Sequence, residues 1–451
     1  MLRRKLYDDL LDWKEKRRKQ KALFVTGARQ VGKSTLARKF GEENYKQVIE
    51  LNFYNDPGAA RIFRHGTPEI ILTQLTAYTG KSVIPDETLV ILDEIQECPA
   101  ARTAIKFLVE DGTCDYLETG SLLGIQYNSV KSLPVGFEER INMYPLDFEE
   151  FLWALDYPAE SIRYIKECFE KQESVGSAAH ERMLRLFDTY MVVGGMPEAV
   201  QTYVSTKDIT ETVRIQKQIL DLYRQDISKY AQGLMSLKIR QIFDSIPSQL
   251  DDKNRRFMLS RLGKGQQMRG LESSFLWLEE AGVALPCYNT SAPVSPLRLN
   301  EKRNLFKLFL NDTGLLTAMS LGDIQFELLQ GELDINSGSI LENVFAQALA
   351  SKGLDLFYYD SKSTGELDFV VQNGKDIDIL EIKSGKDYKK HRALDKALQV
   401  KDWQFQRKIV FCKSDVKAEG EILYLPFYMI MFYALKEQQR LIWDPLVPDF
   451  N

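Results

Sequence analysis

Histidine and cysteine are scarce in this sequence, which argues against several kinds of active site and metal site. There are only three histidines, which argues against a histidine-based active site. The cysteines lie far apart and form no CxxC pair, which argues against a zinc site or a disulfide framework. The five are Cys98, Cys114, Cys168, Cys287 and Cys412.

Long apolar runs are also missing. The longest, Ile422 to Leu435, is interrupted by Pro426 and is shorter than the roughly 20 residues that a membrane span needs. The first residues, Met1 to Lys5, are charged and do not resemble the apolar core of a signal peptide. We therefore expect a cytoplasmic protein with no membrane partner.

The net charge is small. It is −5 at pH 7, with an isoelectric point of about 5.6. The overall charge of the chain therefore does not attract a polyanion such as a nucleic acid. A nucleic-acid site would have to be a local basic patch. The 451 residues, of which 44% are hydrophobic, predict several domains with cores of their own.

A glycine-rich loop dominates what is present. It follows a short apolar run, residues 22–26, that is typical of a buried strand, and it precedes a predicted helix that includes residues 36–40. The loop fits the phosphate-binding pattern G-x-x-x-x-G-K-[ST], in which backbone N–H groups surround an anion at a helix N-terminus. Its lysine would reach the β- and γ-phosphates of ATP, and its serine would bind Mg²⁺. The predicted nucleotide-binding residues are Gly27, Ala28, Arg29, Gln30, Val31, Gly32, Lys33, Ser34 and Thr35.

Two further strands end in residues suited to the same site. The run 88–94 is apolar and ends in Asp93 and Glu94. Asp93 would hold Mg²⁺, and Glu94 would polarise the attacking water as a general base. The strand 114–121 ends in Thr119 and Ser121, whose hydroxyls would sense the γ-phosphate.

Strands alternate with helices in this part of the chain. Further strands are predicted at 47–52 and 141–144. Alternation of this kind predicts an α/β fold with a parallel sheet covered by helices, and it places ligands beyond the carboxyl ends of the strands. From about Phe148 to Tyr230 helical periodicity takes over, broken at Gly194-Gly195 and resumed after Pro197.

Several segments together resemble a large prokaryotic family that joins an AAA-type ATPase to a C-terminal domain of unknown function. They are the phosphate loop, LDEIQ (92–96), TGS (119–121), YPLDFEEFL (144–152), GGMPEAV (194–200) and QDISKY (225–230). The resemblance implies that the helical stretch is a lid on the nucleotide domain.

One position departs from that resemblance. Many relatives have Gly-Arg where this chain has Gly136-Phe137. If that arginine serves ATP hydrolysis in the relatives, no residue fills its role at this position of the chain, or the role has moved to Arg140 or Arg102. A neighbouring subunit of an oligomer could also supply it.

Residues 232–318 fit a winged helix, with helices at 237–250 and 270–281 and strands at 283–288 and 306–311. A basic stretch between the helices could bind DNA phosphates, or it could be a solvated face or a contact to the ATPase domain. Its members are Lys253, Arg255, Arg256, Arg261, Lys264 and Arg269.

The C-terminal part offers a second set of acids. Asp368 and the pair Glu381 and Lys383 lie on two predicted strands, and Glu342 lies on the helix before them. An Asn373-Gly374 turn would bring Asp368 opposite the Glu381 region, allowing one residue for a bulge.

This arrangement resembles the PD-(D/E)xK nuclease fold. The resemblance implies Mg²⁺ or Mn²⁺ held by Glu342, Asp368 and Glu381, with Lys383 steadying the attacking water. The alternative is a structural salt bridge between strands. A downstream run of Lys386, Lys389, Lys390, His391 and Arg392 would add positive charge for a nucleic acid.

The sequence thus predicts a multidomain α/β protein. Its predicted parts are an ATPase domain (1–147), a helical lid (148–231), a winged helix (232–318) and a nuclease-like domain (319–451). Two hypotheses remain open. Either nucleotide state controls a C-terminal domain that cleaves or binds nucleic acid, or the protein is an ATP-driven switch with a catalytically silent partner-binding domain.

Overall fold

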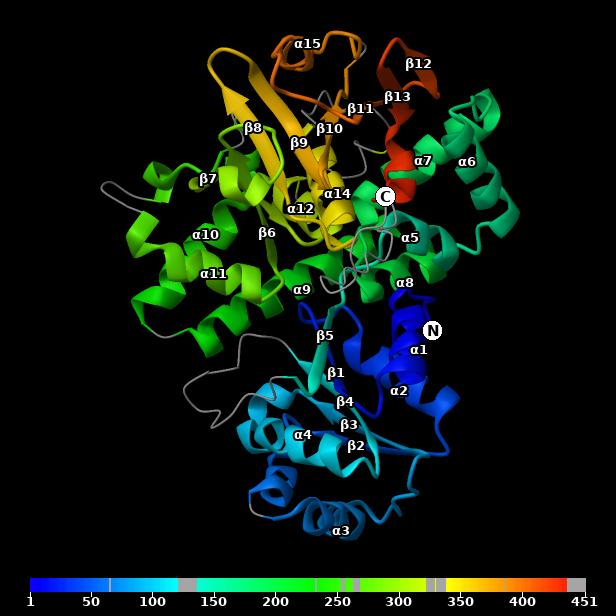
Figure 1. The fold of residues 1–451 in the computed structure, drawn as a ribbon, viewed down its shortest axis with the longest axis vertical. Coiled ribbons are helices and arrows are strands. Elements are labelled where there is room, and N and C mark those ends of the chain that lie inside the picture. The colour runs from blue at the N-terminus through cyan, green and yellow to red at the C-terminus, as the bar shows by residue number, and fades with distance from the viewer. Residues whose placement is uncertain are drawn as a thin grey trace, which may run out of the picture.

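The computed structural model describes residues 1–64, 66–120, 136–231, 233–252, 256–262, 268–321, 329, 338–385 and 387–435. It has two lobes joined by a layer of helices, with the N-terminal lobe in blue and cyan and the C-terminal lobe in yellow and orange (Figure 1). Several predicted residues lie outside this described part, namely Ser121, Lys253, Arg255, Lys264 and Lys386, together with the side chain of Arg269.

The N-terminal lobe is a parallel sheet covered by helices on both faces. Its strands follow the order β2-β3-β4-β1-β5, and every pair is parallel, as the sequence predicts. The strands are β1 (Ala22–Thr26), β2 (Gln47–Asn52), β3 (Thr88–Asp93), β4 (Asp115–Gly120) and β5 (Glu138–Asn142). The helices are α1 (Leu6–Lys16), α2 (Lys33–Asn44), α3 (Pro68–Thr79) and α4 (Pro99–Asp111).

Strand β5 begins earlier than the sequence suggested. It starts at Glu138 and ends at Asn142, not Tyr144, because it pairs with β1 from Ala22 to Thr26. Strand β4 lies between β1 and β3, so the phosphate loop and the acids after β3 flank the end of β4. This order brings the carboxyl ends of all three strands to one edge.

Helices fill the layer between the lobes. They are α5 (Phe148–Ala154), α6 (Ala159–Lys171), α7 (Ser177–Val193), α8 (Pro197–Thr206) and α9 (Ile209–Tyr230). Asp147 caps α5, because its side chain accepts a hydrogen bond from the N–H of Glu150 while the Glu150 side chain accepts from the N–H of Asp147. Helix α9 lies across the boundary between the lobes (Figure 1).

The C-terminal lobe is built on a single mixed sheet, with the order β12-β13-β11-β10-β9-β8-β6-β7. Its strands are β6 (Ala284–Thr290), β7 (Glu301–Leu310), β8 (Phe357–Ser361), β9 (Gly365–Asn373), β10 (Asp376–Ile382), β11 (Arg407–Cys412), β12 (Lys417–Glu419) and β13 (Ile422–Pro426). Its helices are α10 (Leu234–Leu250), α11 (Glu272–Glu280), α12 (Thr313–Leu321), α14 (Gly338–Ala350) and α15 (Arg392–Leu398).

The predicted winged-helix elements are present, but their hairpin has another partner. Strand β6 pairs in parallel with β8, so the β6–β7 hairpin continues the C-terminal sheet. The predicted boundary at 318/319 therefore does not separate two sheets. Two described members of the basic stretch pair with acids, Arg256 with Asp360 and Arg261 with Asp252.

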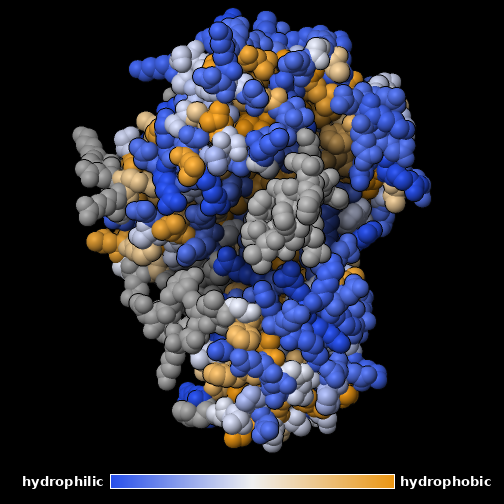
Figure 2. Space-filling model, viewed as in Figure 1, coloured by the Kyte–Doolittle hydropathy of each residue, from blue (hydrophilic) through white to orange (hydrophobic). Residues whose placement is uncertain are grey.

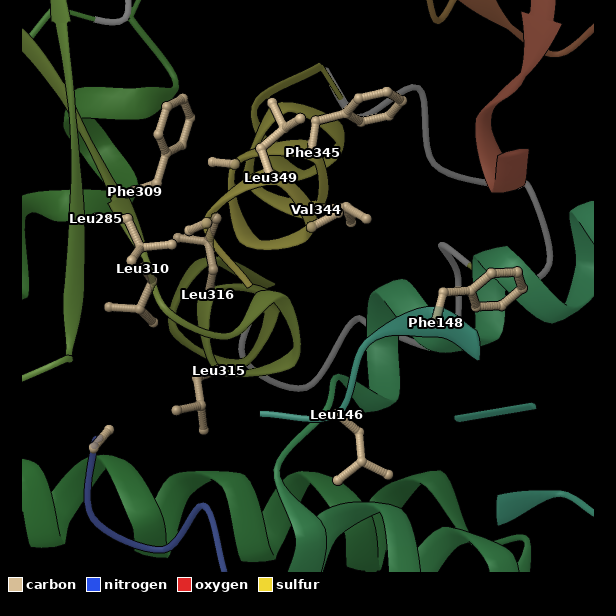
Figure 3. Packing of buried hydrophobic residues seen from close by; sticks show 14 of the residues in the cluster. Leu146, Phe148, Leu285, Phe309, Leu310, Leu315, Leu316, Val344, Phe345 and Leu349 are labelled. Atoms are coloured by element: carbon tan, nitrogen blue, oxygen red, sulfur yellow. The ribbon is translucent and has the colours of Figure 1, made fainter. Parts of the chain in front are cut away.

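One hydrophobic core joins both lobes through the helical layer. It runs from Leu10 in α1 to Tyr433 near the C-terminal end of the described chain. Figure 3 shows Leu285, Phe309 and Leu310 of the sheet facing Leu316 and Leu349 of α12 and α14. Separate cores cover the outer face of each sheet. The two lobes are therefore packed against a common interior.

The longest apolar run is part of this interior. Residues 422–426 form β13, and Phe427–Phe432 form a buried 3₁₀ helix. None of the helices in the described ranges is long and apolar enough to cross a membrane. Hydrophilic residues cover much of the face in Figure 2, with apolar residues scattered among them.

Candidate functional site: the phosphate loop and the acid cluster

The phosphate loop connects β1 to α2 and closes against the segment after β5. Gly27 has φ +144°, and a Cβ there would overlap the carbonyl oxygen of Met143. The N–H of Met143 donates to the carbonyl of Thr26 at 2.7 Å. Only glycine fits this position, because the turn needs a positive φ and the neighbouring backbone is in contact.

Lys33 is the first residue of α2 and is buried under the loop that precedes it. Its ammonium donates to the carbonyls of Gly27 at 3.0 Å and Ala28 at 2.8 Å. Burial lowers the pKa of Lys33, while the nearby Glu94 and Asp93 carboxylates oppose that shift. The ammonium is thus held inside the ring of backbone that would surround a phosphate.

Asp93 collects three donors at the end of β3. The hydroxyl of Ser34 donates to its Oδ1 at 2.7 Å, the amide of Asn52 donates to its Oδ2 at 2.6 Å, and the Thr119 hydroxyl also donates to it. Hydroxyl and carboxylate oxygens are the ligands that Mg²⁺ prefers. Ser34 and Asp93 therefore fit the role of holding Mg²⁺, and Thr119 lies beside them.

Glu94 follows Asp93 in a left-handed backbone conformation, with φ 55° and ψ 48°. Its carboxylate accepts a hydrogen bond from the side-chain amide of Gln96. Non-glycine residues in this conformation are uncommon and cluster at functional sites. Glu94 lines a small pocket with Lys33 and Arg29, on the side of the loop where a terminal phosphate would lie.

The same pocket is covered by residues from other parts of the chain. Helix α9 contributes Tyr223, Asp226 and Ile227. Helix α11 contributes Trp277, and the corner between α11 and β6 contributes Ala281 and Val283. Arg29 forms an ion pair with Asp226, and the Tyr223 hydroxyl donates to the carbonyl of Arg29 at 3.1 Å. Burial raises the pKa of Asp226, and Arg29 opposes that shift.

Arg4 holds the opposite side of the loop. Its buried guanidinium donates to the carbonyls of Val31 at 3.0 Å and Tyr144 at 2.5 Å, and to the Glu150 carboxylate at 3.2 Å. No local pattern in the sequence singles out Arg4, because its partners lie up to 146 positions away.

The two arginines proposed for ATP hydrolysis, Arg102 and Arg140, lie away from the phosphate loop. Arg102 forms buried ion pairs with Glu118 at 3.5 Å and Glu138 at 3.0 Å. Glu138 pairs with Ala22 at the amino end of β1, whereas the phosphate loop follows its carboxyl end. Arg140 is exposed and pairs with Phe24 in the middle of the sheet. Neither position lies at the carboxyl end of β1, where the phosphate loop begins, so the structure gives no support to either arginine as the catalytic one for the site of its own chain.

Phe137 lies at that same far end. The N–H of Ala22 donates to its carbonyl at 2.8 Å, and its ring packs against the outer core of the N-terminal sheet. An arginine at this position could not reach the phosphate loop of its own chain. It could act only on the site of a neighbouring chain.

The C-terminal acids surround a lysine that the sequence did not point to. Lys307 of β7 is fully buried, and its ammonium lies 3.0 Å from Glu342 and 2.5 Å from Glu366. Ligand oxygens of Glu342, Glu366 and Asp368 all lie within 4.8 Å of one another. This group contains Glu366 in place of the predicted Glu381.

Glu381 lies beside the group and pairs with Lys383 at 2.8 Å. Burial and the neighbouring Asp368 raise the pKa of Glu381 to about 8. Strands β9 and β10 pair as predicted around the Asn373-Gly374 turn, but no bulge is needed because Leu380 is already in register with Phe369. Asp368 accepts a hydrogen bond from the N–H of Ile382 at 2.8 Å.

The downstream basic residues are also paired. Lys389 lies 2.6 Å from Glu419, Lys390 lies 2.6 Å from Asp387, and His391 lies 2.8 Å from Asp395. These three side chains offer less free positive charge than the sequence suggested.

Comparisons with known proteins agree with the N-terminal site. A family model described as an AAA domain matches residues 19–152. Two models described as domains of unknown function, DUF8612 and DUF4143, match residues 184–325 and 337–429. The comparison with curated proteins finds no match.

The solved structures found by comparison are distant. The Walker-type ATPase of Pyrococcus abyssi is 13% identical, with 71% of this chain and 96% of that chain covered and a TM-score of 0.43. The Aeropyrum pernix ORC1 protein in complex with DNA is 13% identical, with 73% and 94% covered and a TM-score of 0.28. PCH-2 of C. elegans is 14% identical, with 35% and 43% covered and a TM-score of 0.22. The site geometry and the family match together make the N-terminal part an AAA-type P-loop ATPase domain.

Proposed function

We propose that the protein is an ATP-driven switch whose N-terminal domain hydrolyses ATP and whose C-terminal lobe binds a partner without cleaving it. The observation that carries the first half is the convergence of Lys33, Ser34, Asp93 and Glu94 at one edge of the sheet. Each comes from the end of an element that the parallel order places there.

The residues divide the work of hydrolysis. Lys33 exchanges its bonds to the loop carbonyls for bonds to the β- and γ-phosphate oxygens, so its buried charge gains a partner. Ser34 and Asp93 would hold Mg²⁺, which would supply neutralising charge at the phosphates. Glu94 accepts the proton of the attacking water, and Gln96 orients its carboxylate.

Separate measurements of nucleotide affinity and turnover test this assignment. Lys33→Ala should abolish tight ATP binding, because it removes the ammonium inside the loop. Glu94→Gln should bind ATP as the wild type does but turn it over about 10²–10⁴-fold more slowly, because an amide cannot take the proton. Lys39→Ala, at a half-buried lysine of the same helix that lines no part of the pocket beside the phosphate loop, is the matched control. Wild-type turnover by Glu94→Gln would remove Glu94 from the general-base role.

Lys307 supports the second half of the proposal. A cation already lies between Glu342 and Glu366, fully shielded from solvent, at hydrogen-bonding distance to both. A metal at the same acids would have to displace it, and a displaced buried ammonium would lose both partners. The acids fit a metal by their oxygens, but the complete set of side chains does not fit one.

A metal-dependent nuclease is the second candidate, favoured by the close grouping of Glu342, Glu366 and Asp368. Single- and double-stranded DNA incubated with the protein, with and without ATP and Mn²⁺, separates the two. Cleavage that requires Mn²⁺ and is lost in Asp368→Ala would establish the nuclease. Binding without cleavage would support the switch, with the DNA as one class of partner.

A further inference from the structure

Arg29 occupies an unusual place in the phosphate loop. It is the third residue of the loop, and its side chain reaches Asp226 near the end of α9. About a third of the arginine side chain is exposed, whereas Asp226 is almost buried, at 9%. The Tyr223 hydroxyl, one helical turn earlier, holds the backbone carbonyl of the same arginine at 3.1 Å. Helix α9 therefore contacts both the side chain and the backbone of Arg29.

This arginine is well placed for the reacting phosphate. It lines one pocket with Lys33 and Glu94, the residues assigned to the phosphates and to the water. Arg102 is held near the amino end of β1 by its ion pairs, and Arg140 lies in the middle of the sheet, as described above. Arg38, on the helix that follows the loop, is engaged with Glu50 through both nitrogens of its guanidinium edge.

We infer that Arg29 is the catalytic arginine of ATP hydrolysis, supplied by the chain's own loop, and that Asp226 is the positioning residue that holds it until ATP binds. This inference rests on the proposed ATPase function. The planar guanidinium pairs equally well with a carboxylate or a phosphate, so Asp226 and the γ-phosphate compete for one group. Binding of ATP draws Arg29 to the phosphate and releases α9.

The chemical step balances with this assignment. Water adds to the γ-phosphorus, and the bond from that phosphorus to the bridging oxygen of ADP breaks. The departing ADP oxygen keeps the bonding electron pair, and Glu94 takes the proton of the water. Arg29 donates hydrogen bonds to the phosphoryl oxygens, where negative charge is largest in the transition state.

Release of Asp226 would change the contacts of α9 with the C-terminal lobe. Helix α9 packs against α8, α10 and α12, and it lies between the lobes (Figure 1). Gln216 of α9 donates to the carbonyls of Val192 at 2.8 Å and Val193 at 2.9 Å, next to the Gly194-Gly195 break. The Arg29–Asp226 pair thus couples the nucleotide to the helix that both lobes share.

Two substitutions in the full chain should act in opposite directions. Arg29→Ala should lower kcat by about 10³-fold, the lower range for a catalytic arginine, while KM for ATP changes by less than about tenfold. Arg29→Lys should not restore the rate, because a lysine cannot make the two-pronged contact. Asp226→Asn should instead tighten binding of a non-hydrolysable ATP analogue several-fold, because the competitor for Arg29 is gone. Arg214→Ala and Glu211→Gln, an exposed pair on the same helix, are the matched controls.

If the Arg29–Asp226 ion pair had only a structural role, the result would be different. In that case Arg29→Ala and Asp226→Asn would both lower the melting temperature and shift turnover in the same direction, and the inference would fall. Asp226→Ser is a second variant, in case the asparagine perturbs the helix.

Because Arg29 acts within its own chain, turnover per chain should also stay constant as protein concentration rises. A steep rise would assign the role to a neighbouring subunit. Absence of ATP binding by the wild type would instead overturn the ATPase function itself.

Discussion

Gly282 lies directly against the amide of Ala28, so closely that a Cβ on Gly282 would lie 3.0 Å from that nitrogen. Ala28 belongs to the phosphate loop, and Gly282 belongs to the corner between α11 and β6. The C-terminal lobe therefore contacts the backbone that would bind a nucleotide.

Gly282→Ala should loosen this contact. Gly282 has φ +68°, where a side chain costs about 1–2 kcal/mol, and the atom it would meet is backbone that cannot rotate away. We expect the corner to shift off the loop and a fluorescent ATP analogue to bind several-fold faster in stopped-flow measurements. Gly80→Ala is the control, because Gly80 has the same φ and a Cβ there would meet nothing within 4 Å. Equal binding rates in both variants would show that the corner does not obstruct the loop.

Arg4→Met should destabilise the N-terminal lobe. The substitution leaves the carbonyls of Val31 and Tyr144 and the Glu150 carboxylate without their buried donor. Loss of one partner of a buried ion pair costs about 3–5 kcal/mol, measured as a lower midpoint in urea unfolding. Arg3→Met is the control, since Arg3 is exposed over the ring of Trp153. Equal midpoints for the two variants would contradict the role given to Arg4.

Some features of the site could be predicted from the sequence and others could not, for a physical reason. The phosphate loop and the acids after β3 were predictable because backbone phosphate binding needs a fixed local order of glycine, lysine and hydroxyl. The Arg29–Asp226 pair joins residues 197 positions apart, and no local pattern reports such a contact. The hairpin of the predicted winged helix was recognisable, but its pairing with β8 depends on the folded sheet.

Two residues of the C-terminal group, Glu366 and Lys307, have sequence patterns that indicate their burial with the other acids. Glu366 lies two residues before Asp368, so alternation along β9 places both on one face. Lys307 stands inside the apolar run Leu305 to Leu310, where a lysine needs buried acids to pair with. The predicted set of Glu342, Asp368 and Glu381 lacked both the fourth acid and the internal cation.

Lys307→Met should convert the acid group into a cation site. Without the ammonium the protein should lose about 3–5 kcal/mol of stability, because the acids lose their partner. Mn²⁺ should then raise the melting temperature of the variant more than that of the wild type, because it binds only the folded state. Lys302→Met, an exposed lysine on the same strand, should respond to Mn²⁺ as the wild type does. A strong Mn²⁺ effect on the wild type would favour the nuclease.

Asp312 should make stability depend on pH. It is fully buried and accepts hydrogen bonds from the N–H groups of Gly195 at 2.6 Å and Leu315 at 2.9 Å. Burial raises its pKa to about 6. A carboxyl whose pKa is raised on folding contributes stability that is fully present below its unfolded value, near 4, and is lost as pH rises through 6.

Melting temperatures of the wild type and Asp312→Asn between pH 4 and 7 measure this contribution, since the asparagine does not titrate. The advantage of the wild type should grow as the pH falls from 7 to 4. A difference that stays constant over this range would show that Asp312 has the same pKa in the folded and unfolded chain.

The β6–β7 hairpin gives the molecule a mechanical connection between its two chemical centres. Gly282 rests on the phosphate loop two residues before β6 begins, and Lys307, paired in register with Cys287, lies among the C-terminal acids. Cys287 lies five positions after Gly282, which corresponds to at most about 17 Å of chain, and β6 begins at Ala284 within this span. A nucleotide that displaces Gly282 would therefore act on the strand that pairs with Lys307. Occupancy of the loop would in this way alter the ion pairs of Lys307 with Glu342 and Glu366, three residues that lie outside the pocket beside the phosphate loop.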